Sequence, residues 1–212
     1  MKKIRKGLFI TLEGCEGSGK TTHSALLAQY LKKKGFNVLR TREPGGTSLA
    51  ENIRKILLHP KSRISPLAEL FLYEASRAQH MAEVIIPTIK AGKIVLCDRF
   101  ADATLAYQGY GRGLDKQMIA QLNKIASFGI KPSLTIYLDI PAGVGLQKAR
   151  KLKKGTDRLE LEAVSFHNRV RKGYLALARK EPKRIKVVKI QRIIEETSKL
   201  IAREIDRALK SA

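Results

Sequence analysis

The chain has 212 residues, 43% of them apolar, so it is long and apolar enough to bury a core. Its 42 Lys and Arg against 19 Asp and Glu give a net charge of +23, which indicates an anionic substrate, a polyanionic partner or a heavily solvated surface. No run approaches the ~20 apolar residues of a membrane span, the two cysteines form no CxxC motif for zinc or redox chemistry, and the basic residues are not interleaved with aromatic ones as in nucleic-acid binders. We therefore expect a cytoplasmic protein for which nucleic acid is a disfavoured partner.

Apolar segments of strand length alternate with helical patterns along the chain. The strand-like segments are LFITL (8–12), NVLRT (37–41), KIVLC (93–97), LTIYLDI (134–140) and IKVVKI (185–190). Apolar spacing predicts helices over 21–34, 66–91, 115–128, 142–152, 158–180 and 192–210. We expect the second helix to bury its apolar stripe, with Phe71 in the core, and to bend at Pro87. The alternation predicts an α/β fold, a parallel sheet with helices on both faces.

Directly after the first strand segment, GCEGSGKT fits the phosphate-loop pattern GxxxxGK[ST]. Glycines let the backbone turn its N–H groups toward phosphate, and the following helix offers its positive N-terminal end to the same anion. Lys20 is expected to reach the β- and γ-phosphates, and Thr21 to offer an oxygen to Mg²⁺. The motif predicts binding of a nucleoside triphosphate. The residues expected to contact it are Gly14, Cys15, Glu16, Gly17, Ser18, Gly19, Lys20, Thr21 and Thr22.

Asp98 and Arg99 directly follow the third strand segment. Ligands of parallel α/β sheets bind beyond the carboxyl ends of the strands, so both residues are expected beside the phosphate loop. A carboxylate there suits Mg²⁺ held through water, which makes Thr21 and Asp98 the candidate metal-binding residues. Arg99 indicates that a second phosphate group binds in the same crevice.

Several motifs together resemble those of the thymidylate kinases, which transfer the γ-phosphoryl group of ATP to dTMP. The matching stretches are FITLEGCEGSGKTT, TREPGGT, ASRAQH, VLCDRFADATLAYQGYGRGL and DRLELEAVSFHNRVRKGYLALA, in the family's order. The phosphate loop occurs in many ATPases, whereas REPGG and the segment after Asp98 are far more specific. The resemblance implies a three-layer P-loop kinase fold with about five parallel strands. It further implies one nucleoside monophosphate kinase domain over 1–212, with a lid at about 148–158.

The resemblance also implies which residues hold the acceptor's sugar and phosphate. Arg42 and Arg99 would both bind the acceptor phosphate, since two guanidiniums suit a dianion. Glu16 would lie near the 3′-hydroxyl of the sugar. A carboxylate repels phosphate, so it makes more sense as a contact to the sugar or to magnesium. Arg54, on the helix after TREPGGT, contacts the substrate or else faces solvent.

For the base, the resemblance implies a stacking residue and four residues that read its edge or its sugar. Tyr73 would stack on thymine, where most relatives have Phe, and Arg77, one helical turn later, would bond a base carbonyl. Thr104 and Gln108 correspond to residues that read the base edge, and Tyr107 would crowd the 2′ position and reject ribonucleotides. Because thymine and uracil differ by one methyl group, we expect dUMP to be a poor but detectable acceptor.

Some thymidylate kinases carry an arginine in the phosphate loop directly after its acidic residue, where this chain has Gly17. The charge must then come from elsewhere, because phosphoryl transfer spreads negative charge over the transferred oxygens. The basic run KARKLKKGTDR is similar to the lid of bacterial-type members, and we expect Arg150 and Arg158 to supply the charge, with Lys153 or Lys154 as substitutes. The candidate catalytic residues are Lys20, Arg99, Arg150, Arg158 and Glu16.

Two alternatives stay open on sequence grounds. One is another nucleoside monophosphate kinase with the same loop and a different base pocket. The other is a nucleic-acid-binding ATPase, prompted by the charge of +23 but disfavoured because such a protein needs no acceptor pocket. Relatives in the family are homodimers, so we expect a homodimer that binds ATP, dTMP and Mg²⁺.

Overall fold

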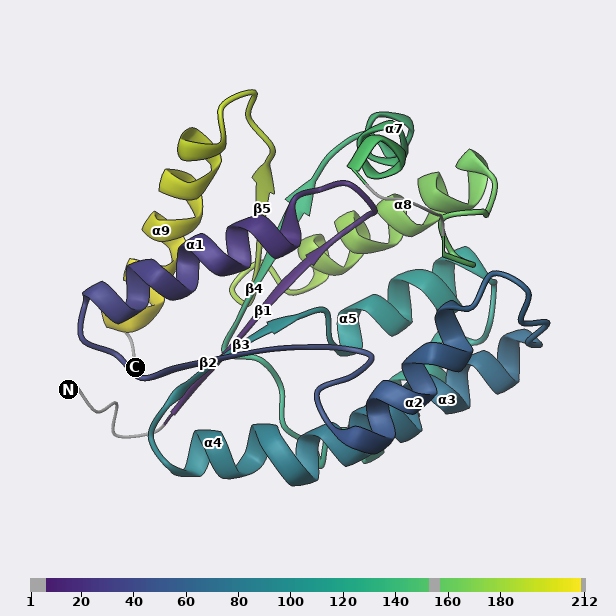
Figure 1. Cartoon of the computed structure of the whole chain (residues 1–212), viewed down its shortest axis with the longest axis horizontal. Coiled ribbons are helices and arrows are strands. Elements are labelled where there is room, and N and C mark those ends of the chain that lie inside the picture. Colours follow the sequence, from purple (N-terminus) through teal and green to yellow (C-terminus); the bar gives the residue numbers. More distant parts are fainter. Residues whose placement is uncertain (1–6, 153–156, 211–212) are drawn as a thin grey trace.

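The computed structural model describes residues 7–152 and 157–210, and within them it contains a five-stranded parallel sheet (Figure 1). The strands are β1 (Leu8–Gly14), β2 (Val38–Arg42), β3 (Ile94–Asp98), β4 (Leu134–Asp139) and β5 (Ile185–Lys189). Their order in the sheet is β2-β3-β1-β4-β5. Each predicted strand segment forms a strand, so the expected α/β fold is confirmed.

The central strands read as apolar runs because both of their faces are covered. Every residue of β1 and of β4 is buried, whereas β2 at one edge has only half-buried and exposed residues and β5 at the other edge mixes buried with exposed ones. The parallel register sets Leu12 of β1 and Arg42 of β2 on either side of Asp98 in β3. The carboxyl ends of three strands therefore deliver the phosphate loop, Arg42 and Asp98 to one edge of the sheet.

Helices cover the sheet on both faces. On one face α1 (Lys20–Lys33) and α9 (Ile194–Lys210) pack side by side, and Leu31 and Ile205 join the core formed with Ile10 of β1 (Figure 1). On the other face the apolar side chains come from α8 (Val164–Lys180) and from the helical segments next to β3. This arrangement gives the three layers that the sequence predicts.

The remaining helical segments include those that line the site at the carboxyl ends of the strands. They are α2 (Ser48–Leu58), α3 (Pro66–His80), η1 (Met81–Ile85), α4 (Ile86–Lys90), α5 (Ala101–Thr104), η2 (Leu105–Gly111), α6 (Lys116–Ala126) and α7 (Ala142–Leu152). Several begin at side-chain caps: Thr47, Ser65 and Asp115 each accept a backbone N–H three residues ahead. The helical turns of α5 and η2 were not predicted, because the segment is rich in glycine and short.

The predicted helix over 66–91 exists as the continuous run of α3, η1 and α4, with a π-helical segment directly ahead of Pro87. Its buried face was predicted only in part, because Leu70, Met81 and Ile85 of the apolar stripe are buried but Phe71 is not. Phe71 is 51% exposed and Leu67 is 44% exposed, while Glu69, Glu74 and Arg77 are buried. The reason is that α3 turns several polar side chains inward to build the site, which leaves Leu67 and Phe71 outside.

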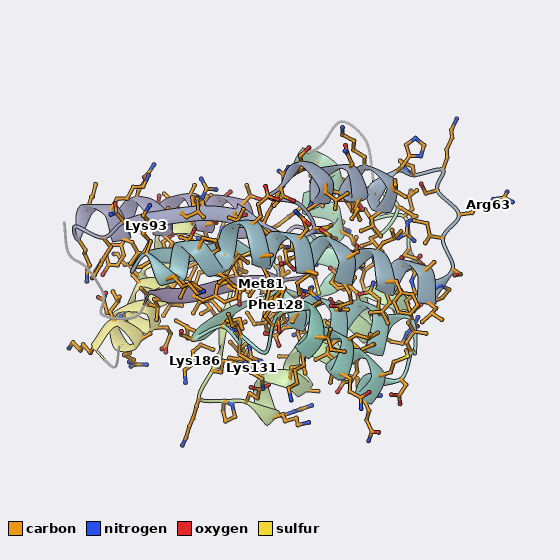
Figure 2. All side chains as sticks on the ribbon, turned by 90° about the horizontal axis from the view of Figure 1, so that it is seen from below. Arg63, Met81, Lys93, Phe128, Lys131 and Lys186 are labelled. Atoms are coloured by element: carbon orange, nitrogen blue, oxygen red, sulfur yellow. The ribbon has the colours of Figure 1, made fainter. Side chains whose placement is uncertain are left out.

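In the view from below, apolar side chains lie in the core and basic side chains lie on the outside (Figure 2). Met81 is fully buried between the long helix and the sheet, whereas Arg63 extends from the loop ahead of α3 into solvent. Lys93 and Lys131 are likewise exposed at the outside of the fold. Lys93 and Arg63 lie at opposite ends of this view, as expected where charge is spread over a solvated surface (Figure 2).

Candidate active site

The phosphate loop joins the end of β1 to the start of α1. Gly17 (φ 68°) and Gly19 (φ 80°) adopt left-handed backbone conformations, which cost glycine little. The Lys20 ammonium folds back over the loop and donates to the carbonyl oxygens of Gly14 (3.0 Å) and Cys15 (3.1 Å). Burial is the largest cause that lowers the pKa of Lys20. The loop therefore holds a nearly buried amine where the motif predicts a triphosphate.

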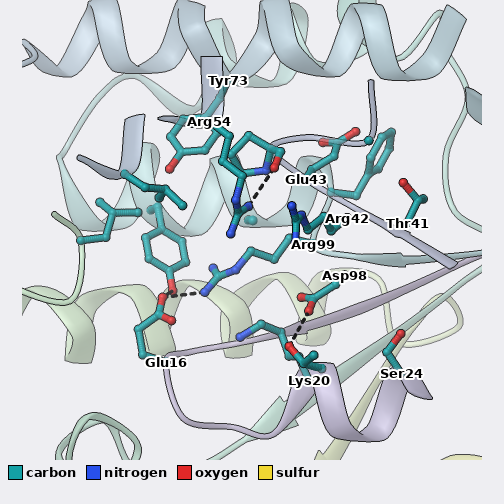
Figure 3. A pocket seen from close by; sticks show the side chains of 18 of the residues that line it. Glu16, Lys20, Ser24, Thr41, Arg42, Glu43, Arg54, Tyr73, Asp98 and Arg99 are labelled. Carbon is teal, nitrogen blue, oxygen red and sulfur yellow. Dashed lines mark hydrogen bonds and ion pairs between the residues drawn. The ribbon is translucent and has the colours of Figure 1, made fainter. Parts of the chain in front are cut away.

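Glu16, the acidic residue of the loop, is tightly paired. Arg99 Nη2 lies 2.6 Å from Glu16 Oε1, and the Tyr107 hydroxyl donates to the same oxygen over 2.9 Å (Figure 3). The Arg99 guanidinium also lies over the Tyr107 ring, 4.7 Å from its centroid. Burial alone would raise the pKa of Glu16, but Arg99 and Lys20 oppose it and lower that pKa to about 2. Glu16 is therefore ionised, and it orients Arg99 toward the loop.

The end of β3 places a carboxylate beside the first residues of α1. The Thr21 hydroxyl donates to Asp98 Oδ2 over 3.4 Å, so two hard oxygen atoms lie together at the start of α1 (Figure 3). Among the described residues, no three His, Cys, Asp or Glu side chains cluster as a protein-only metal site. One carboxylate and one hydroxyl suit Mg²⁺, which usually keeps waters and binds substrate phosphates as well.

Arg99, the next residue, has a left-handed backbone with φ 71°. That conformation is uncommon for a residue with a side chain, and such strain concentrates at functional sites. Its backbone N–H still donates to Leu12 O of β1 over 2.9 Å. The turn thus fixes the guanidinium of Arg99 at the mouth of the crevice, where the sequence predicts the acceptor phosphate.

Two further arginines line the same side of the crevice. Arg42 makes a two-bond contact with Glu51, at 3.1 and 2.9 Å, and Arg54 donates to Pro44 O over 2.8 Å (Figure 3). The peptide bond between Glu43 and Pro44 is cis. Burial lowers the pKa of Arg54, and the neighbouring Arg42 adds to this effect. Arg54 therefore faces the site rather than bulk solvent.

Arg77 is the most heavily bonded side chain of the site and is only 2% exposed. Its Nε donates to Glu43 (2.9 Å), and its Nη1 donates to Glu74 (2.9 Å) and Asn123 (2.6 Å). Its Nη2 donates to the Thr104 hydroxyl over 2.9 Å. The sequence did not point to the two carboxylates or to Asn123. Of these, Glu43 could have been suspected from its place in REPGG.

The long helix and η2 also supply the other residues predicted to contact the base. Tyr73 and Gln108 both line the cavity, and Gln108 Nε2 donates to the fully buried Glu69 over 2.8 Å. Burial raises the pKa of the Tyr73 hydroxyl well above its usual value, so it stays protonated. Tyr73 therefore offers a neutral aromatic face, as stacking on a base requires.

The lid residues divide between two environments. Arg150 is exposed near the end of α7, and its neighbour Ala149 lines the cavity. Arg158 instead donates to Leu57 O over 2.9 Å and pairs with Glu69. Lys153 and Lys154, predicted as substitutes, fall outside the described residues, as do Gly155 and Thr156.

The crevice is a cavity of about 750 Å³ that spans both groups of residues. Loop residues 16–22 and Asp98 line one end of it (Figure 3). Every residue predicted to bind the acceptor lines it too: Glu16, Arg42, Arg54, Tyr73, Arg77, Arg99, Thr104, Tyr107 and Gln108. The structure thus brings together, in one volume, a phosphate loop and an aromatic pocket that carries several arginines.

Other polar residues of the interior serve the framework. His80 is fully buried and contacts Thr41 (2.7 Å) and Glu43 (3.1 Å), so it stabilises the framework. Cys15 and Cys97 are free and buried. Within residues 7–152 and 157–210, every helix is too short or too polar to span a bilayer.

Comparison with known proteins identifies relatives over nearly the whole chain. The sequence model of the thymidylate kinase family matches residues 12–201. Thymidylate kinase of Syntrophotalea carbinolica is 56% identical over 194 residues, which cover 89% of this chain and 90% of that protein. Thymidylate kinase of Synechococcus sp. (strain JA-2-3B'a(2-13)) is 56% identical over 178 residues, 84% of each chain.

A solved structure agrees with these relatives. Thymidylate kinase from Ehrlichia chaffeensis superimposes with a TM-score of 0.78 at 36% sequence identity, over 95% of this chain and 99% of that one. The similarity covers both the phosphate-loop half and the acceptor half of the fold.

Proposed function

Since the chain belongs to the thymidylate kinase family, we propose that its cavity binds ATP and dTMP together and that it forms dTDP and ADP, a step of dTTP synthesis. One observation carries this function: the phosphate loop and the acceptor-binding side chains line the same cavity. In that volume two nucleotides can meet with their phosphates between Lys20 and Arg99. Positioning of this kind accounts for most catalysis in phosphoryl transfer.

The mechanism follows from where the charges lie. The acceptor is a phosphate oxygen that is already anionic, so a loose, in-line transfer requires no strong general base. Lys20 and Arg99 neutralise charge from either side of the transferred group, and Glu16 holds Arg99 in place. Of the lid residues, Arg150 and Arg158 supply further positive charge. Arg42 and Arg54 assist Arg99 in holding the acceptor phosphate.

Magnesium is part of the proposal. Thr21 and Asp98 would hold it beside the phosphate loop, because they present a hydroxyl and a carboxylate to one spot. When bound, Mg²⁺ neutralises charge on the β- and γ-phosphates. The whole chain acts as one kinase domain with the lid at about 148–158, which excludes water from ATP.

We also propose a homodimer in the cytoplasm. Exposed apolar side chains lie on three helices that pack against one another: Leu49 and Ile56 on α2, Leu67 and Phe71 on α3, and Ile125 on α6. An apolar surface of this kind fits a subunit interface. Sedimentation equilibrium at micromolar concentration would show a dimer, and a monomer there would contradict the proposal. The free cysteines fit a reducing compartment.

Steady-state kinetics with a panel of acceptors tests the function. The enzyme with ATP and Mg²⁺ is offered dTMP, dUMP, dCMP, AMP or GMP in turn, and dTMP is expected to have the highest kcat/KM. We expect dUMP to be detectable but weaker, because one methyl group is worth only about 1–3 kcal/mol. If another monophosphate is the best acceptor, the chain is a different nucleoside monophosphate kinase.

A further inference from the structure

Glu69 is a carboxylate that the reaction itself does not use. It lies on α3 with a fully buried side chain. It accepts hydrogen bonds from Gln108 Nε2 (2.8 Å) and from Nε and Nη2 of Arg112 (both 3.3 Å), and it pairs with Arg158. Two guanidiniums beside one buried carboxylate keep it ionised. An ionised carboxylate can only accept hydrogen bonds.

This contact fixes which end of the Gln108 amide faces the cavity. Because Glu69 only accepts, the amide nitrogen of Gln108 must point toward it. The amide oxygen of Gln108, which is an acceptor, is then the end left for a ligand in the cavity that this residue lines. A glutamine without such a partner can turn its amide over and offer a donor instead.

Arg77 supplies the opposite polarity in the same pocket. The buried carboxylates of Glu43 and Glu74 hold its guanidinium, which has only donors. The pocket thus presents a donor from Arg77 and an acceptor from Gln108. Thymine shows an acceptor, O4, next to a donor, N3–H, whereas cytosine shows a donor at N4 next to an acceptor at N3. The two bases present reversed patterns along this edge.

We propose that Glu69 is a positioning residue that determines specificity: by fixing the Gln108 amide, it selects a pyrimidine with an N3–H group and rejects cytosine. This rests on the proposed function, in which Gln108 reads the base. Rejection by a locked pocket is strong, because the wrong base leaves buried polar groups unpaired. With Glu69 replaced by glutamine, the partner can donate or accept, so the Gln108 amide is free to turn over.

The test compares kcat/KM for dTMP with kcat/KM for dCMP in the full-length enzyme. In Glu69→Gln we expect the dTMP-to-dCMP ratio to fall about tenfold or more, with KM for ATP within about twofold of wild type. Glu83→Gln is the matched control, since Glu83 is an exposed glutamate of the same long helical run. Glu83 accepts a hydrogen bond from Gln79, outside the site. The control should keep the wild-type ratio.

A second pair of variants shows whether the effect passes through Gln108. Gln108→Leu alone should lower the dTMP-to-dCMP ratio of kcat/KM. The double variant with Glu69→Gln should lower this ratio little further, because the two residues act as one unit. If the fold-changes of the two single variants in the dTMP-to-dCMP ratio multiply in the double variant, the proposal is overturned. A folded Glu69→Gln variant with an unchanged dTMP-to-dCMP ratio would overturn it too. If Glu69→Gln does not fold, Glu69→Asp is measured, and it should narrow the ratio less than Gln108→Leu. If neither folds, Glu69 is structural and the inference fails.

The outcome is separable from that of the proposed function. A wild-type enzyme that does not prefer dTMP contradicts the function itself. A wild-type enzyme that prefers dTMP, with a Glu69→Gln variant that keeps this preference, contradicts only the role of Glu69.

Discussion

Glu13 shows how one buried carboxyl group makes stability depend on pH. Its Oε1 accepts from Phe100 N (2.7 Å) and its Oε2 contacts the Tyr174 hydroxyl (2.7 Å), at the end of β1 just before the phosphate loop. Burial, assisted by Asp102, raises the pKa of Glu13 from 4.5 to about 8. Between these values the folded protein holds a proton that the unfolded chain has released. Folding is therefore weakened as pH rises through this window.

We expect Glu13→Gln to remove this pH dependence. A glutamine resembles the protonated acid: its oxygen can accept from Phe100 N and its nitrogen can donate to the Tyr174 oxygen. Wild type should lose roughly 3–5 kcal/mol of unfolding free energy relative to this variant between pH 4.5 and pH 8. Urea unfolding at several pH values measures the difference. A wild-type stability curve parallel to that of the variant would contradict the raised pKa.

At this scale the sequence predicted the groups that face the substrates better than those that support them. Lys20 and Arg99 stand in motifs whose chemistry can be read directly, Gln108 was predicted from the family resemblance, and all three line the cavity. The supporting carboxylate Glu69 contacts Arg112 and Arg158 through the tertiary fold, whereas Glu74 contacts Arg77 one turn along α3. No spacing in the chain shows that a helix will turn these charges inward.

Among the elements, the phosphate loop and α7 approach each other so closely that only glycines fit. A Cβ atom on Gly17 would lie 1.9 Å from the carbonyl oxygen of Gly145, and one on Gly145 would lie 2.3 Å from Glu16 O. This contact explains why the loop carries no arginine at position 17. The clash is consistent with our prediction that the lid residues Arg150 and Arg158 supply this charge instead.

Gly17→Ala should therefore damage both stability and ATP binding. Gly129→Ala is the matched control: Gly129 has φ 72°, close to the 68° of Gly17, but no atom lies within 4 Å of a Cβ added there. Both variants bear the left-handed strain, of about 1–2 kcal/mol, and only Gly17→Ala bears the clash. We expect its Tm to lie a further ~4 °C or more below that of the control, with a raised KM for ATP. Equal Tm values would show that the contact is unimportant.

Secondary structure was predicted well wherever one periodicity dominated. All five strands and α1, α6, α7 and α9 follow their apolar patterns. The inward face of α3 was predicted only in part, because apolar spacing was taken to mark the buried side. In this protein the site requires buried charges, so Phe71 and Leu67 lie outside.

Over the whole molecule, the fold separates two kinds of positive charge. Arg77 is buried and Arg99 is partly buried, and both are paired with carboxylates at the cavity. Exposed residues such as Lys93, Lys131 and Arg63 are spread over the outside (Figure 2). The net charge of +23 thus requires no nucleic-acid partner, and it favours attraction of anionic nucleotides to the cavity.

The central claim is that two nucleotides meet in this cavity and pass a phosphoryl group between them. The most direct measurement is a single turnover with γ-labelled ATP, Mg²⁺ and excess enzyme, in the presence and absence of dTMP. The account predicts that the label passes into dTDP and that little reaches inorganic phosphate when dTMP is present. Label released as inorganic phosphate independently of dTMP, and faster with added DNA or RNA, would instead indicate a nucleic-acid-dependent ATPase and contradict the account.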